Sequence, residues 1–158
     1  MIKRISIFLA FALIAAPSLI ATGCGGSGSE DETLSKSEFI RRADSLCRKV
    51  DQREAGEFAA YGRANAKSFN QDPEKGLEKA IRVLVLPSIR KEIEEIKTLG
   101  IPEGDEDQVE GFFTEVEAAI AKTDEDPLSI ENSRPQSPFF PSYKLGRAYG
   151  FNNCAEMY

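Results

Sequence analysis

Apolar residues recur every three or four positions through three stretches of the chain, the spacing that places side chains on one face of an α-helix. The first stretch follows Ser35, which has Glu38 three residues later, as in a capping box at a helix start. Gly56 and Gly62 weaken the expectation that this helix continues unbroken toward Phe69. Its apolar face is expected to consist of Phe39, Ile40, Ala43, Leu46, Cys47 and Val50.

The second stretch is expected to form a helix that starts at Pro73, since proline after Asp72 is typical of a first helical turn. Pro87 lies inside the periodic pattern and has no N–H to bond the carbonyl of Val83, so a kink is expected there. The helix should end at residues 99–102. Its apolar positions are Leu77, Ile81, Leu84, Val85, Ile89, Ile93 and Ile96.

A third helix is expected after Asp105, a suitable N-cap with Gln108 in the answering position of a capping box. Its apolar positions are Val109, Phe112, Phe113, Val116, Ala119 and Ile120. Residues 128–141 contain three prolines and are expected to form a loop, followed by a short fourth helix that stops at Gly150. The pattern therefore predicts an all-α fold, a single up-and-down bundle of about four helices.

The N-terminal segment has a different character. Lys3 and Arg4 precede residues 5–16, which are apolar except for Ser6. This run is too short to cross a hydrocarbon core, which needs roughly 20 residues. A basic start, a short apolar run and small residues after it are typical of a secretory signal peptide.

The four residues Ala21-Thr22-Gly23-Cys24 resemble the lipobox of bacterial lipoprotein precursors. In that family a diacylglyceryl group is attached to the cysteine sulfur and the signal is cut before it. The resemblance implies cleavage between Gly23 and Cys24 and lipidation of Cys24. Ala21 stands where leucine is commonest. Small residues at these positions also suit ordinary signal peptidase, and the product would then be a free secreted protein.

The expected organisation has three parts. Residues 1–23 form the signal peptide, and residues 24–33 form a Gly/Ser/acidic tether that has no apolar side chain to bury. Residues 34–158 form the helical domain. The expected localisation is exported and membrane-anchored, on the extracytoplasmic face of a bacterial cell envelope.

Charge excludes one class of partner. The chain has 20 Lys+Arg and 26 Asp+Glu; removing the signal takes Lys3 and Arg4 and no acid, so 18 basic residues remain against 26 acidic ones, a net charge of −8. This sign is wrong for nucleic acid, and no nucleic-acid partner is expected. A monomer is expected, with the membrane bound through the lipid anchor.

The chain has three cysteines. If Cys24 carries lipid, Cys47 and Cys154 remain, an even number in a compartment where disulfides persist. A structural disulfide between them is favoured over two buried free thiols.

Two segments carry a further resemblance. "LSKSEFIRRADSLC", residues 34–47, and "YGFNNC", residues 149–154, are similar to small predicted lipoproteins of actinobacteria. The shared positions are Leu34, Lys36, Phe39, Ile40, Ala43, Asp44 and Cys47, then Tyr149, Gly150, Phe151 and Cys154. The resemblance implies the helical bundle and the bridge, and it implies no activity.

Candidate catalytic and metal sites are few, because the chain has no histidine. Histidine-dependent triads, dyads and metal sites are therefore excluded. The acidic runs 105–107 and 124–126 lack the spacing of a calcium loop. Helix capping or solvation is favoured for them, with weak calcium binding as the alternative. No metal and no cofactor is expected.

The predicted function is a non-catalytic envelope-associated binding or interaction module, with an unknown protein or small-molecule partner. One alternative is a small-molecule or lipid-binding bundle with an apolar pocket lined by Leu84, Val85, Pro87, Phe112 and Phe113. The other is a carboxylate-dependent enzyme, with Asp44 and Glu57 as the acids nearest to apolar faces. For Asp44 a helix pair with Arg48 is favoured. Phe139 and Phe140 are expected to dock on the domain itself or to contact a partner.

Overall fold

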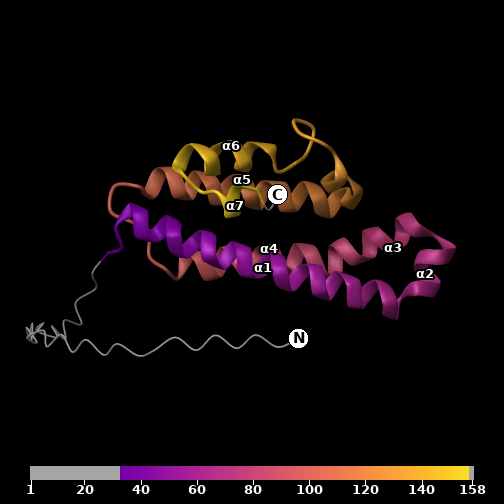
Figure 1. The fold of residues 1–158 in the computed structure, drawn as a ribbon. Coiled ribbons are helices and arrows are strands. Elements are labelled where there is room, and N and C mark those ends of the chain that lie inside the picture. The colour runs from indigo at the N-terminus through magenta and orange to yellow at the C-terminus, as the bar shows by residue number, and fades with distance from the viewer. Residues whose placement is uncertain (1–32, 157–158) are drawn as a thin grey trace, which may run out of the picture. The chain divides into compact units, whose positions relative to one another are not determined.

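The computed structural model describes residues 33–156. The expected signal peptide, Cys24 and nearly all of the tether lie outside the described residues. Within residues 33–156 the chain folds into helices and turns, with no strand. The prediction of an all-α up-and-down bundle is confirmed (Figure 1).

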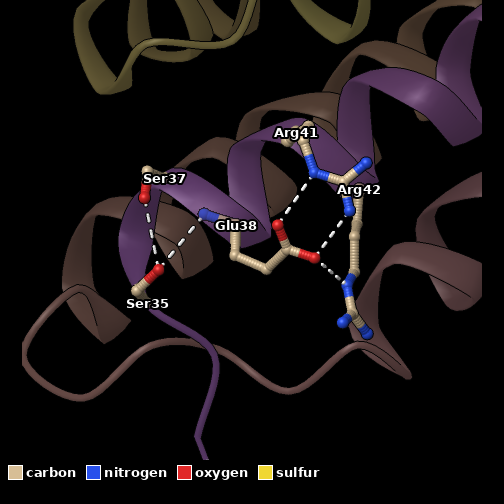
Figure 2. Close-up of polar contacts among 5 residues, drawn as sticks. All are labelled: Ser35, Ser37, Glu38, Arg41 and Arg42. Carbon is tan, nitrogen blue, oxygen red and sulfur yellow. Dashed lines mark hydrogen bonds and ion pairs between the residues drawn. The ribbon is translucent and has the colours of Figure 1, made fainter. Parts of the chain in front are cut away.

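Helix α1 (Lys36–Ala64) begins where the sequence predicted. The hydroxyl of Ser35 accepts the backbone N–H of Glu38 at 3.3 Å, which satisfies one of the free N–H groups of the first turn. The Glu38 carboxylate does not return to Ser35 but binds the guanidinium groups of Arg41 and Arg42 (Figure 2). Only half of the capping box therefore forms. The helix continues through Gly56 and Gly62 without a break.

The chain then returns along α1 through four short elements. These are α2 (Ala66–Gln71), α3 (Pro73–Ala80), the π-helical turn η1 (Ile81–Val85) and α4 (Leu86–Lys97). The Asp72 carboxylate accepts the N–H of Lys75 at 3.1 Å, so Asp72 caps α3 and Pro73 occupies its first turn, as predicted. Helix α4 packs against α1, and the two lie side by side in Figure 1.

The interruption expected at Pro87 takes the form of the π-helical turn directly before it. The N–H of Leu86 bonds the carbonyl of Ile81, five residues back, which is the hydrogen-bonding pattern of a π-helix. Pro87 then enters the first turn of α4, where a missing N–H costs little. The wider turn changes the direction in which Leu84 and Val85 face, relative to an undisturbed α-helix.

The second half of the chain forms α5 (Glu106–Glu125), the 3-10 turn η2 (Pro127–Glu131), α6 (Phe140–Tyr149) and α7 (Asn153–Glu156). Helix α6 lies on α5, and α7 packs against both α1 and α6. Gly150 ends α6 with φ of 117°, a backbone conformation that side-chain-bearing residues rarely adopt. The predicted stop at Gly150 is thus confirmed.

Aromatic rings connect the helices at the centre of the core. Phe151 lies 5.2 Å from Phe112 of α5, 6.1 Å from Phe39 of α1 and 4.9 Å from Tyr149 of α6, measured between ring centroids. Such tilted pairs stabilise the fold beyond the area they bury. The segment after α6 is therefore part of the core that joins the two halves of the bundle.

Candidate functional site

Cys47 of α1 and Cys154 of α7 form a disulfide, with their Cα atoms 5.1 Å apart. Both residues are fully buried, as is Glu92 of α4, whose carboxylate lies within 4.8 Å of the two sulfur atoms. The predicted pairing is confirmed. With the sulfurs bonded to one another, the bridge is a structural element. Glu92 carried no recognisable signal in the sequence, because nothing local distinguishes it from Glu94 and Glu95, the other acids of the same helix.

Asp44 holds the same C-terminal segment, one turn before Cys47. Its carboxylate accepts the backbone N–H of Asn152 with both oxygens, at 3.1 and 3.0 Å, and the N–H of Cys154 at 3.1 Å. Within the described chain its partners are thus these backbone groups and not Arg48, so the predicted helix pair is wrong. The carboxylate caps the start of α7 from a neighbouring helix, a structural role.

Asp44 and Glu57 are not brought together. They lie thirteen residues apart on α1, which corresponds to about 20 Å along a helix axis. Glu57 is about half exposed and faces Arg53 across 3.8 Å. A pair of catalytic carboxylates needs a separation of roughly 5–10 Å, and these two acids do not provide it.

In each of the two acidic runs, one carboxylate pairs with side chains of the domain, Asp105 in the first run and Asp124 in the second. The Asp105 side chain does not cap α5, although Asp105 occupies the predicted N-cap position. Its carboxylate accepts the Tyr149 hydroxyl at 2.8 Å and lies 3.3 Å from the Lys36 ammonium. Burial, followed by the Asp105 carboxylate, raises the pKa of Tyr149. In the second run, Asp124 pairs with Arg82 at 2.8 Å.

The two phenylalanines of the proline-rich segment occupy different environments. Phe139 is fully buried in the core. Phe140 is half-buried and stacks on Tyr143 with ring centroids 6.1 Å apart. A partner contact by Phe139 would require this side chain to leave the core. Docking on the domain itself is the arrangement present for Phe139.

A cavity of about 350 Å³ lies between α1 and η1, and we call it the α1–η1 groove. Asp51, Glu54, Ala55 and Phe58 face it from α1, at the spacing of one helix face. Across from them, η1 contributes two of the residues predicted to line a pocket. The full lining is Asp51, Glu54, Ala55, Glu57, Phe58, Ala59, Leu84 and Val85.

The other residues of the predicted pocket lie elsewhere. Phe112 and Phe113 are buried in the core, and Pro87 is exposed at the start of α4. The structure therefore places Leu84 and Val85 opposite α1, where the sequence had placed them opposite the third helix. Because acidic residues lie among the apolar residues of α1, the sequence pattern did not predict that this helix forms one wall of the groove.

Glu54 is the most unusual side chain of the groove. Its Oε1 atom is inaccessible to solvent and has no hydrogen-bond partner within residues 33–156. Burial raises the pKa of Glu54; its interaction with the Ser88 hydroxyl opposes this shift, and the charge of Asp51 adds to it. Burial also raises the pKa of Asp51. Asp51 and Glu57 are exposed, so it is the Glu54 carboxylate whose surroundings solvate negative charge poorly.

No protein-family model, curated protein sequence or solved structure matches this chain. The resemblance to small actinobacterial lipoproteins thus stays a prediction that rests on the residues quoted above. None of the helices within residues 33–156 combines the length and the apolar character that a membrane span requires.

Proposed function

We propose that this chain is a bacterial lipoprotein, exported and held to a membrane by acyl chains on Cys24, where its helical domain acts as a non-catalytic binding or interaction module. The observation that carries the proposal is the use of the three cysteines. Cys47 and Cys154 are joined to each other, and Cys24 is the cysteine that remains. It follows a basic and apolar segment and stands at the end of a lipobox-like sequence.

The bridge supports export as well, since disulfides persist in oxidising compartments and are rare in reducing ones. Dual acylation is the kind of modification that gives stable anchoring, because each buried CH₂ contributes about 0.8 kcal/mol. The tether of residues 24–33 is composed of glycine, serine, acids and one threonine after Cys24. Such a composition suits a flexible spacer between a membrane and a folded domain.

A non-catalytic role is supported by the use of the acidic side chains. Asp44 caps α7 and Asp105 binds Tyr149 and Lys36, so these carboxylates serve the fold. The chain also has no histidine that could exchange protons near neutral pH.

The intact mass of the mature protein tests the anchor. The full chain is produced in a bacterium that processes lipoproteins and is extracted from the membrane fraction. We expect a polypeptide that starts at residue 24, carries the added mass of acyl chains and contains one disulfide. Cys24→Ser should remove the acyl mass, while Ser27→Ala in the tether should leave it unchanged. A mature chain that starts at residue 24 with an unmodified thiol, or that retains residues 1–23, would contradict the proposal.

A second candidate function is small-molecule binding by the domain, favoured by the α1–η1 groove. Its volume of about 350 Å³ falls in the range of ligand pockets, roughly 300–1,000 Å³. Ligand detected by native mass spectrometry of the purified protein would support this function. A native mass that corresponds to the protein without any bound small molecule would count against it.

A further inference from the structure

The α1–η1 groove carries negative charge at its surface. Within the described chain, its lining includes the carboxylates Asp51, Glu54 and Glu57 and no lysine or arginine. The nearby Arg53 faces Glu57 at 3.8 Å and donates to the Ser88 hydroxyl at 3.5 Å. This charge distribution favours a cationic ligand over a neutral or anionic one.

The rest of the lining is apolar. Phe58, Leu84 and Val85 supply the larger side chains, and two alanines of α1 keep the space between them open. An apolar wall of this kind gains free energy by covering hydrocarbon. It also argues against a divalent metal ion, because calcium takes six to eight oxygen ligands and this wall offers none. The lining therefore suits a cation that is attached to a hydrocarbon body.

Glu54 gives the groove a specific acceptor. A buried carboxylate oxygen without a hydrogen bond is costly, and such a group in a native fold calls for an explanation. An ammonium group can donate up to three hydrogen bonds and carries the compensating charge. The described side chains leave the Oε1 atom without a partner, but this atom is inaccessible to solvent. A donor that enters from the groove therefore reaches it only when the Glu54 side chain turns toward the open groove.

The π-helical conformation of η1 is an independent observation that favours a functional site at the groove. Residues 81–85 form a π-helical turn, a rare conformation that is found frequently at functional sites. This turn places Leu84 and Val85 in the wall of the groove.

We propose that the α1–η1 groove binds a small amphiphilic amine, whose ammonium group lies at Glu54 between Asp51 and Glu57. The hydrocarbon part of the amine packs on Phe58, Leu84 and Val85. The cavity is near the lower limit for ligand pockets, so the ligand is a single aromatic ring or a short chain. This inference rests on the small-molecule binding function proposed above and names its ligand class.

Isothermal titration calorimetry with 2-phenylethylamine tests the inference. The mature protein is held in nanodiscs of zwitterionic lipid, and empty nanodiscs give the blank. If the protein is instead found free of lipid, the same titration is made in buffer. We expect one saturable site at neutral pH. The neutral analogue 2-phenylethanol and the anion 3-phenylpropionate should bind at least tenfold more weakly, because neither offers an ammonium group.

Two variants separate the charge of the groove from its shape. Glu54→Gln removes the charge at nearly constant volume and should weaken amine binding by about tenfold or more. Ala55→Leu keeps every carboxylate but fills the cavity from an exposed position of α1, and should abolish binding. The matched control is Glu110→Gln, which removes one charge from the exposed side of α5 and should bind the amine within about twofold of the parent chain.

The outcomes are distinguishable. Equal affinity for the amine and the alcohol would keep the groove as a ligand site but overturn the amine class. Binding that Glu54→Gln and Glu110→Gln reduce equally, or that Ala55→Leu leaves intact, would overturn the location. Saturable binding of calcium that displaces the amine would overturn the organic ligand. No binding of any probe would overturn the small-molecule function, while the mass of the mature chain would still decide the lipid anchor.

Discussion

Replacing Asp44 by alanine removes the acceptor that holds the C-terminal segment on α1. The carboxylate receives the backbone N–H groups of Asn152 and Cys154 at 3.0–3.1 Å and is only 8% exposed. A hydrogen bond to a charged group contributes about 1.5–3 kcal/mol, so the two donors set an upper bound of about 3–6 kcal/mol. Alanine also ends the cost of burying a carboxylate, which offsets part of this loss. We expect the free energy of unfolding to fall by about 3 kcal/mol.

The measurement is urea unfolding followed by far-UV circular dichroism, because the chain has no tryptophan. In a thermal melt, a loss of 1 kcal/mol lowers the melting temperature of a domain of this size by a few degrees, so Asp44→Ala should lower it by roughly 10 °C. Glu57→Gln, a change of an exposed acid on the same helix, is the control and should stay within about 0.5 kcal/mol of the parent. If Asp44→Ala loses no more stability than this control, the cap on α7 has no energetic role and the reasoning is refuted.

Three further results should follow from the structure. Reduction of the Cys47–Cys154 disulfide, which closes a loop with a sequence separation of 107, should lower the free energy of unfolding by about 4.7 kcal/mol in the chain-entropy model; equal urea midpoints with and without reductant would contradict it. In an NMR titration, Glu38 should titrate with a pKa of about 2, because its two arginine partners hold the carboxylate ionised. Since this pKa is lowered, the pairing is complete at neutral pH and is lost as the pH falls through about 2; a midpoint at the ordinary value would contradict it. Gly150→Ala should destabilise the domain by about 1–3 kcal/mol because φ is 117° there. Gly62→Ala, at a helix position with open space around it, should instead stabilise the domain by about 0.5–1 kcal/mol. Thermal melts that rank the two variants in the opposite order would show the strain argument to be wrong.

The features predicted correctly from the sequence are those that depend on near neighbours. Ser35 and Asp72 cap the helices that follow them, and Gly150 ends α6, because each signal acts within one helical turn. The partners of Asp44 and Asp105 lie 108 and 44 residues away along the chain. Spacing along one helix suggested a partner only four residues distant for Asp44. No local pattern reports which segment the fold brings against a carboxylate.

The candidate groove was predicted only in part for a related reason. In the pocket alternative, the kink expected at Pro87 was to open a space between Leu84, Val85 and the third helix. A π-helical turn has more residues per turn than an α-helix, so the faces before and after it are rotated against each other. The acids at positions 51, 54 and 57 made the other wall look like solvated helix surface. Amphipathic periodicity does not reveal a groove wall that combines carboxylates with apolar residues.

The Cys47–Cys154 bridge determines how the described domain responds to a pulling force. When tension is applied between residues 33 and 156, it runs along α1 to Cys47, crosses the two sulfur atoms and leaves through α7. The chain between the cysteines is mechanically shielded, so only the start of α1 and the end of α7 can be drawn out. Chemical reduction removes this direct connection, and the same load would then unravel the part of α1 after Cys47 and helices α2 to α6.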